Sequence, residues 1–157
     1  MAGRHWLFKS DADTFGWTDL KRLPGWRTAW DGVRNYRARN FLRDEVAAGD
    51  GVLFYHSQAE KAVVGICTVT KAAFPDATQF DKKHKGYDPD SPRDDPRWYA
   101  VEIKIASEFA TPVTLDALRE VPALAKMALL QRGNRLSIQP VTNEEWAIVE
   151  KLGARKG

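Results

Sequence analysis

Several short stretches of the chain alternate between apolar and polar residues, as in Trp98 to Phe109. This period of two is typical of β-strands whose faces lie in different environments. Gly65 interrupts one such stretch and predicts a bulge there. The pattern predicts strands over residues 5–9, 51–57, 62–73, 98–109 and 135–139, with a further edge strand near 112–113.

Helical patterns are shorter and lie between the predicted strands. Apolar positions recur with helical spacing from Val33 to Val46, which predicts a helix there. Thr142 and Glu145 have the spacing of a capping box, so a final helix is expected to begin there and to end at Gly153. Further short helices are predicted over residues 18–23, 115–121 and 122–130.

Together these elements predict an α+β fold in a single domain spanning residues 1–157. About five to six strands are interleaved with short helices, without the regular strand–helix alternation of a doubly wound sheet. A small mixed β-barrel with flanking helices therefore fits the pattern best. The chain length agrees, since domains most often have roughly 100–150 residues.

Residues 75–96 interrupt this regular pattern. The segment has no period and is rich in Pro, Asp and Lys. Loops of this length inside compact domains are often functional, for example as lids over a site. The alternative is a solvated surface loop, and the sequence leaves both interpretations open.

Composition restricts the class of protein. Hydrophobic residues make up 43% and charged residues 29%, which is typical of a globular domain. No apolar run approaches the roughly 20 residues of a membrane span, and the first residues do not resemble a signal peptide. We expect a soluble cytoplasmic protein, or a nuclear one in a eukaryote, and favour a monomer. The net charge of +3 is compatible with a polyanionic partner.

The helix predicted from Val33 carries an unusual concentration of arginine. Arg34, Arg37, Arg39 and Arg43 lie within ten positions. Guanidinium groups match phosphate oxygens, so this face is either a phosphate-binding patch or a solvated helix face. Asn35 falls on the apolar side of the same helix, where its amide needs hydrogen-bond partners. It either ties down a loop or faces a ligand cavity.

Polar and aromatic residues also gather at predicted strand ends. Tyr55 and Ser57 share one face of a strand, and Ser57 lies at its end, where the mouth of a barrel would be. Tyr55 could therefore stack on a ligand ring or belong to the core. Trp98 starts a strand directly after the long loop. Ser137 and Gln139 share one face of the last predicted strand.

The sequence shows no pattern typical of an enzyme. A nucleophile elbow, a P-loop and a dinucleotide-binding fingerprint are all missing. The three histidines are scattered and lack metal-ligand spacing. Cys67 lies in an apolar run and is interpreted as a small buried residue. We therefore expect no catalytic residues, no metal and no cofactor.

Seven motifs, in the same order along the chain, resemble the EVE domain family over about residues 6–152. They are Trp6–Ser10, Trp30–Asn40, Leu53–Ser57, Val64–Ile66, Phe74–Asp76, Pro96–Trp98 and Arg135–Val141. The resemblance implies a PUA-like pseudo β-barrel, related to YTH and ASCH domains that bind RNA or DNA. EVE domains are associated with DNA that carries modified cytosine, so the resemblance implies a DNA-binding reader of a modified base.

Placed on that fold, the candidate residues divide into three groups. The aromatic residues expected to stack on or enclose a base are Trp30, Tyr55 and Trp98. The polar residues expected to contact its edge are Asn35, Ser57, Ser137 and Gln139. The cations expected to hold the nucleic-acid backbone are Lys9, Arg34, Arg37, Arg39 and Arg97. Because flipping a base costs a few kcal/mol and stacking returns about 1–3 kcal/mol, the polar and phosphate contacts would set the net affinity.

Two other functions stay open at this stage. One is an RNA-binding or RNA-processing domain, like those of the ASCH relatives. The other is a sensor of a free nucleoside or a similar small molecule, using the same pocket. Affinity for a nucleic acid would fall steeply with salt, whereas affinity for a free nucleoside would hardly depend on it.

Overall fold

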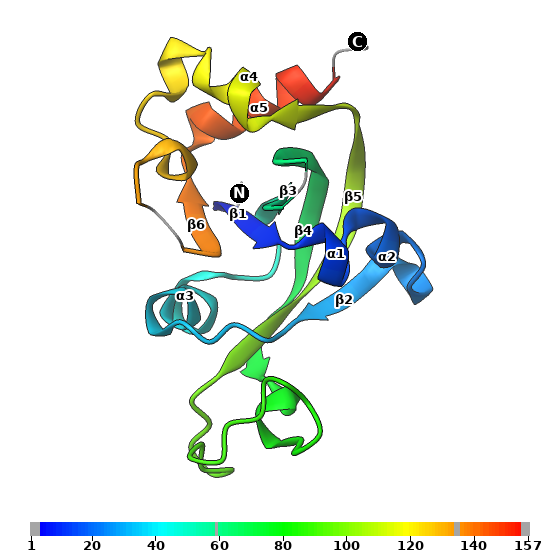
Figure 1. The fold of residues 1–157 in the computed structure, drawn as a ribbon, viewed down its shortest axis with the longest axis vertical. Coiled ribbons are helices and arrows are strands. Elements are labelled where there is room, and N and C mark those ends of the chain that lie inside the picture. Colours follow the sequence, from blue (N-terminus) through cyan, green and yellow to red (C-terminus); the bar gives the residue numbers. More distant parts are fainter. Residues whose placement is uncertain (1–3, 59, 134–135, 155–157) are drawn as a thin grey trace.

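The computed structural model describes residues 4–58, 60–133 and 136–154 and contains a mixed six-stranded sheet (Figure 1). The strands are β1 (His5–Ser10), β2 (Arg27–Trp30), β3 (Gly51–His56), β4 (Ala62–Pro75), β5 (Tyr99–Thr114) and β6 (Ile138–Val141). Their order across the sheet is β2-β5-β4-β3-β1-β6, so β2 and β6 form its two edges. β1 pairs in parallel with β3, and the other pairs are antiparallel. The α+β class and the strand-rich, barrel-like fold predicted from the sequence are confirmed.

Short helices connect the strands. They are α1 (Ala12–Phe15), α2 (Trp17–Lys21), α3 (Tyr36–Asn40), α4 (Leu115–Arg119) and α5 (Asn143–Ala154). A π-helical turn, Phe41–Glu45, continues α3, and 3₁₀ turns occur at Pro24–Trp26, Ala77–Phe80, Pro122–Leu124 and Ala128–Leu130. Within the described residues, no helix is both long and apolar enough to cross a membrane.

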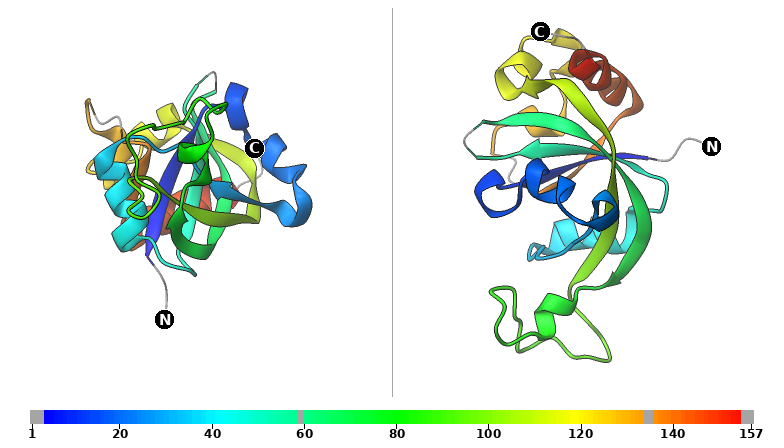
Figure 2. Two further views of the ribbon diagram at one scale, coloured as in Figure 1. Left: turned by 90° about the horizontal axis from the view of Figure 1, so that it is seen from below. Right: turned by 90° about the vertical axis from the view of Figure 1, so that its right-hand side faces the viewer.

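The alternation of side chains along the central strands produces two hydrophobic cores, one on each face of the sheet. Trp6 and Phe8 of β1 belong to the first core, together with Phe54 of β3. Leu7, which lies between them in the sequence, belongs to the second core with Leu53. Helices α2 and α3 pack against the first core, whereas α4 and α5 cover the second (Figure 2). The centre of the sheet is therefore buried on both faces.

The predicted bulge at Gly65 is present. The register between β4 and β5 shifts between Val63 and Gly65. The Trp17 ring lies where a side chain at residue 65 would begin, so this position has no space for a Cβ atom. Gly65 therefore both bends the strand and admits the aromatic ring from α2.

Strands β4 and β5 extend beyond the rest of the molecule and carry residues 76–98 at their end (Figures 1 and 2). We call residues 76–98 the projecting segment. It is organised around the buried Gln79 side chain, whose Nε2 donates to the carbonyl oxygens of Asp76 (2.8 Å) and Trp98 (2.9 Å). The Gln79 Oε1 accepts from the Ser91 hydroxyl (2.6 Å). The segment is thus an ordered structure with its own polar centre.

Two predicted helix boundaries differ from the structure. The helix predicted from Val33 begins at Tyr36, because Asn35 is its extended N-cap residue. The capping box of α5 is confirmed, since Thr142 Oγ1 accepts from the Glu145 backbone (3.1 Å). The helix nevertheless continues past Gly153 to Ala154. Gly153 serves packing rather than termination, because a Cβ atom there would overlap the Phe109 ring.

The remaining differences concern strands. β2 was not predicted, and residues 112–113 continue β5 rather than forming a separate edge strand. The last strand begins at Ile138, three residues later than predicted. Arg135, which belongs to that prediction and to one of the family motifs, lies outside the described residues.

Candidate functional site

A pocket of about 520 Å³ opens between the two edges of the sheet. On one side it is bounded by β2, and on the other by Ser137, which directly precedes β6. The end of β1 and helix α1 form a third wall, and the projecting segment forms a fourth. The lining residues are Lys9, Ser10, Asp11, Thr14, Phe15, Thr28, Ala29, Trp30, Asp31, Gly32, Val33, Arg34, His84, Lys85 and Ser137. The volume lies within the range of pockets that bind small ligands.

Trp30 supplies the largest flat surface in this pocket. Its side chain is 8% exposed and packs between Phe8 and Phe54, with ring centroids 5.3 Å and 5.6 Å away. Trp30 therefore belongs to the first core and also lines the pocket. An aromatic ring held in this way is a rigid platform on which a planar ligand could stack.

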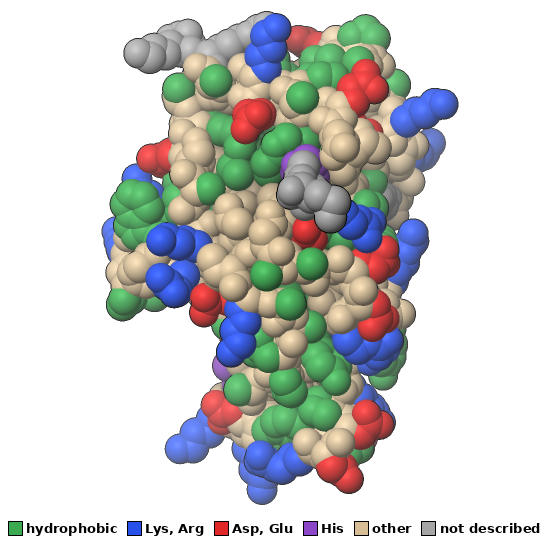
Figure 3. All heavy atoms as spheres, turned by 180° about the vertical axis from the view of Figure 1, so that it is seen from behind, with side chains coloured by type: hydrophobic (Ala, Val, Ile, Leu, Met, Phe, Trp, Pro, Cys, Tyr) green, Lys and Arg blue, Asp and Glu red, His purple; other side chains and the backbone are tan. Residues whose placement is uncertain are grey.

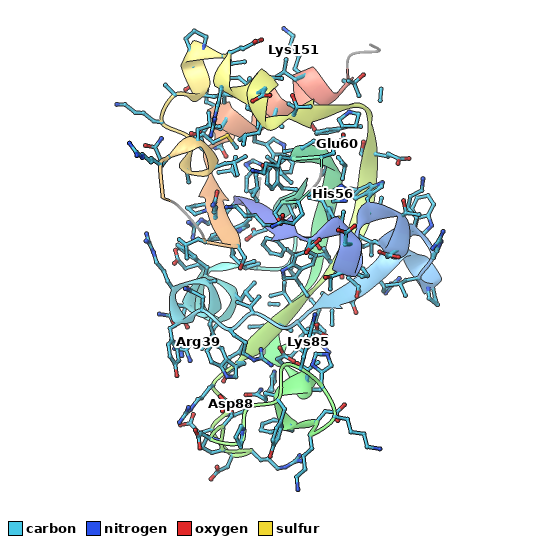
Figure 4. The ribbon with its side chains drawn as sticks, in the orientation of Figure 1. Arg39, His56, Glu60, Lys85, Asp88 and Lys151 are labelled. Atoms are coloured by element: carbon cyan, nitrogen blue, oxygen red, sulfur yellow. The ribbon has the colours of Figure 1, made fainter. Side chains whose placement is uncertain are left out.

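Positive charge enters the pocket from two directions. Lys9 comes from β1, and partial burial lowers its pKa. Lys85 is exposed and comes from the projecting segment, on the side that faces β2 (Figure 4). His84 precedes it and also lines the pocket. Two lysines from opposite walls could hold an anion at the mouth.

Asp31 adds a carboxylate beside Trp30. Burial raises its pKa, and the neighbouring negative charge of Asp76 raises it further, while His84 and Arg34 act in the opposite direction. The pocket therefore combines a flat apolar surface, cations and an anionic acceptor. This is the set of groups that a nucleotide requires: a stacking partner, phosphate partners and a hydrogen-bond partner for the base.

The wall next to Asp31 is fixed by the carboxylate of Asp76, which is fully buried. It accepts hydrogen bonds from the Gly32 backbone (2.8 Å), from Arg34 (3.0 Å) and from the Thr78 hydroxyl (2.6 Å). Burial alone would raise the pKa of Asp76, but these hydrogen bonds outweigh it and lower the pKa below its ordinary value. Asp76 thus joins the strand-to-helix loop before α3 to the projecting segment.

Arg34 lines the pocket, as the sequence interpretation requires, but its donors are already used within the protein. Nε and Nη2 donate to the Gly86 carbonyl oxygen (3.0 and 2.6 Å), and Nη2 also donates to Thr78. Nη1 donates to Asp76 and to the Val33 carbonyl oxygen. Arg34 therefore connects the loop before α3 to the projecting segment, and its guanidinium group donates to protein oxygens.

Trp98 is placed outside the pocket lining, against α3. Its ring stacks on Tyr36 with centroids 4.9 Å apart, and its Nε1 donates to Asp88 (2.7 Å). The Arg39 guanidinium lies over the other member of this pair, Tyr36, and donates to the Arg97 carbonyl oxygen (2.7 Å). Figure 4 shows Arg39 on α3, next to the base of the projecting segment. These residues support the wall that carries Lys85.

The structure does not bring several other candidates to the pocket. Tyr55 lies in the second core, on the opposite face of the sheet. Gln139 is buried, and its Nε2 donates to the Leu136 carbonyl oxygen (2.9 Å). Asn35 caps α3, with its Oδ1 accepting from the Ala38 backbone (3.0 Å). Of the two alternatives for Asn35, the first, a residue that ties down local structure, is the one observed.

Three further candidates are not among the residues that line the pocket. Ser57 is outside the lining, but its backbone N–H donates to the carbonyl oxygen of Ser10 (2.9 Å), which does line it. Arg37 is exposed on α3. Arg97 forms a 3.8 Å ion pair with Asp88 in the projecting segment. Trp30, Ser137, Lys9 and Arg34 are the predicted residues that line the pocket itself.

Sequence reasoning missed several lining residues. Asp31 follows Trp30 within a recognised motif, so its position next to a candidate platform was a usable signal. Lys85 and His84 lie in the long loop that was considered a lid, but no pattern singles them out. Phe15 and Thr28 belong to elements that the alternation did not predict.

The described residues contain no group of three or more His, Cys, Asp or Glu side chains that could hold a metal ion. Cys67 is buried, and burial strongly raises the pKa of its thiol. On the back of the molecule, Lys and Arg side chains are interspersed with Asp and Glu (Figure 3). The pocket is therefore the feature of the described structure with the clearest ligand chemistry.

Comparison with known proteins agrees with this fold. The family model described as "EVE domain" matches residues 4–152. The chain belongs to the EVE domain family. Human thymocyte nuclear protein 1 is 39% identical to this EVE domain over an alignment that covers 94% of the chain and 73% of the human protein.

Solved structures extend the comparison of this EVE domain. The structure of human thymocyte nuclear protein 1 in complex with DNA containing 5-methylcytosine has a TM-score of 0.91 and 37% identity, and the match covers 99% of this chain and all of that chain. An ASCH protein from Zymomonas mobilis matches with a TM-score of 0.55 and 11% identity over 96% of this chain and 97% of its own. The latter likeness concerns the fold alone.

Proposed function

We propose that this protein reads DNA that contains 5-methylcytosine, with the modified base turned out of the duplex into the pocket beside Trp30. The observation that carries the proposal is the pocket itself, which combines an aromatic platform with lysines from two walls. The human relative in the same family was crystallised with DNA of this kind. The volume of about 520 Å³ is sufficient for a base.

Within this proposal, the residues have distinct tasks. Trp30 stacks on the base, and Ser137 lies at the opposite edge of the pocket as a hydrogen-bonding group. Lys9 and Lys85 bind phosphates at the mouth, and the exposed Arg37 extends this contact along α3. Arg34 and Trp98 act indirectly, because their contacts fix the projecting segment.

A direct test is to measure binding of a short duplex with one central cytosine, with and without the 5-methyl group, by fluorescence anisotropy. We expect tighter binding of the methylated duplex and an affinity that falls steeply with salt for both. Binding of neither duplex, or equal binding of both, would contradict the proposal. Tight, salt-independent binding of the free nucleoside would favour the small-molecule sensor instead.

Lysine variants separate backbone contact from general charge. Lys85→Ala should weaken both duplexes alike and reduce the salt dependence by about one phosphate contact. Lys151→Ala is the matched control, since Lys151 is exposed on α5, far from the projecting segment (Figure 4). If the two variants weaken binding equally, Lys85 does not contact the DNA.

We also propose that the protein binds nucleic acid without cleaving it. The test is to incubate labelled DNA and RNA with the protein, with and without Mg²⁺ or Mn²⁺. Intact strands in every sample are expected. Cleavage that requires the protein would overturn the proposal and would favour the ASCH-like processing function.

A further inference from the structure

Three carboxylates lie in or next to the pocket, and two of them are already engaged by the protein. Asp11 caps α1 and accepts from the Asp13 backbone (2.9 Å). Asp76 is buried and accepts from four donors, the three described above and the backbone N–H of Thr78 (2.8 Å). Asp31 differs from both, because no hydrogen bond or ion pair from another residue in the described part of the chain reaches its carboxylate. Apart from a contact with its own backbone N–H, its acceptor oxygens remain available to a ligand.

Asp31 is also placed beside the stacking platform. It directly follows Trp30 at the end of β2, and both residues line the pocket. Gly32 is held by Asp76 immediately afterwards, so the backbone on both sides of Asp31 is fixed. A ring stacked on Trp30 would therefore have its polar edge close to a positioned carboxylate.

The chemistry of a carboxylate selects between bases. An ionised carboxylate only accepts hydrogen bonds. Cytosine and 5-methylcytosine present a 4-amino group, which donates, and acidic side chains accept from this group. Thymine carries the same 5-methyl group but has a carbonyl oxygen at position 4, which a carboxylate repels. The methyl group therefore cannot separate these two bases, whereas the group at position 4 can.

We propose that the Asp31 carboxylate accepts a hydrogen bond from the 4-amino group of the bound base and so distinguishes 5-methylcytosine from thymine. This inference rests on the proposed function of the same pocket. The surroundings support it: the Asp31 side chain is exposed at the pocket near the negative charge of Asp76, and partial desolvation of its carboxyl and that charge raise its pKa. A hydrogen-bond donor from the ligand would offset both the desolvation of the Asp31 carboxylate and its repulsion by Asp76. The opposing charges around it are those of His84 and Arg34.

The first arm of the test leaves the protein unchanged and varies the base. Three duplexes carry C, 5-methylcytosine or T at one position, each opposite guanine. A T·G mismatch flips more easily than a matched pair, so the duplex itself favours T. Any preference for 5-methylcytosine then comes from the pocket. We expect the wild-type protein to bind 5-methylcytosine at least about tenfold more tightly than T, as one base-specific hydrogen-bonding contact provides.

The second arm changes Asp31. Asp31→Asn keeps the shape of the side chain but adds an amino donor that can approach the thymine carbonyl, so the preference should fall by about tenfold. Asp31→Ala should abolish the preference for 5-methylcytosine and leave only the preference for T that the mismatched duplex itself provides. Asp13→Asn is the matched control, because Asp13 is exposed on α1, does not line the pocket and changes the net charge equally. Thermal melting confirms that each variant is folded.

The outcomes separate the two proposals. If the wild-type protein prefers 5-methylcytosine to C but does not distinguish it from T, the assignment of Asp31 is wrong and the reader function stands. The same holds if folded Asp31→Asn keeps the wild-type ratio. If the wild-type protein binds none of the duplexes, the reader function fails and the role of Asp31 fails with it.

Discussion

The Arg34 guanidinium lies 3.0 Å from the buried carboxylate of Asp76, and this ion pair joins the loop before α3 to the projecting segment. Asp76 has no exposed surface, whereas 24% of the Arg34 side chain is exposed. Removing one member of such a pair leaves the other without its partner in a site from which water is largely excluded. The pair therefore determines how firmly the pocket wall is held.

Asp76→Asn should destabilise the protein by about 3 kcal/mol, because a neutral amide cannot replace the charged acceptor of four donors. Urea unfolding measures the change. Asp44→Asn is a suitable control, since Asp44 pairs with Arg43 in an exposed position and its loss should leave the midpoint nearly unchanged. Similar midpoints for the two variants would show that the buried pair contributes little.

The pH dependence of stability should reflect the raised pKa of Asp31. Its pKa is raised in the folded protein, so the protonated form is favoured there, and the charged form costs stability above the folded pKa. Asp31→Asn should therefore melt at a higher temperature than wild type at pH 7. The difference should shrink as pH falls through the raised pKa of the folded protein, and it should be gone below about 3.9, the ordinary Asp pKa in an unfolded chain. A lower melting temperature at pH 7 would contradict the assigned shift.

Tyr36 should influence the projecting segment without contacting a base. It is 53% exposed, yet it stacks on Trp98 and lies under the Arg39 guanidinium. Tyr36→Ala should cost about 1–2 kcal/mol from the lost ring contacts. Tyr36→Ala should also speed amide hydrogen exchange at Gly86. Tyr36→Phe should leave the stability and the exchange rate nearly unchanged. Unaltered exchange in the alanine variant would mean that the stack does not support this wall.

Gly153→Ala should destabilise α5, although alanine normally favours a helix interior over glycine by about 1 kcal/mol. The added Cβ atom would overlap the Phe109 ring, and such overpacking typically costs about 1–3 kcal/mol. Thermal melting shows whether the gain in helix propensity or the cost of overpacking is larger. A smaller residue opposite, in the double variant Gly153→Ala/Phe109→Leu, should restore part of the loss.

The strands were predictable where both of their faces are buried, because alternate residues of β1 and β3 enter different cores and each contains large apolar residues. β2 escaped prediction for a physical reason. It has only four residues, and three of them are not buried, so neither its length nor its pattern separates it from a loop. Its neighbours Pro24 and Gly32 add turn signals at both ends.

The candidate site was predictable only in part. Alternation correctly placed Tyr55 and Phe54 on opposite faces, but it contains no information on which face meets the pocket. Residue type likewise suggested that Arg34 and Trp98 are free to bind a ligand. Their partners, Gly86 and Asp88, come from a long segment whose path is set by tertiary contacts, so the sequence pattern could not reveal them.

The pocket occupies the opening between β2 and the residues that precede β6, two margins that are distant in sequence and belong to opposite edges of the sheet. A molecule bound there contacts both edges of the sheet at once. It bridges two edges that backbone hydrogen bonds would join in a closed barrel. A bound ligand should therefore hold β2 and the residues before β6 together. We expect the amide protons of both margins to become protected together, in proportion to the fraction of protein bound.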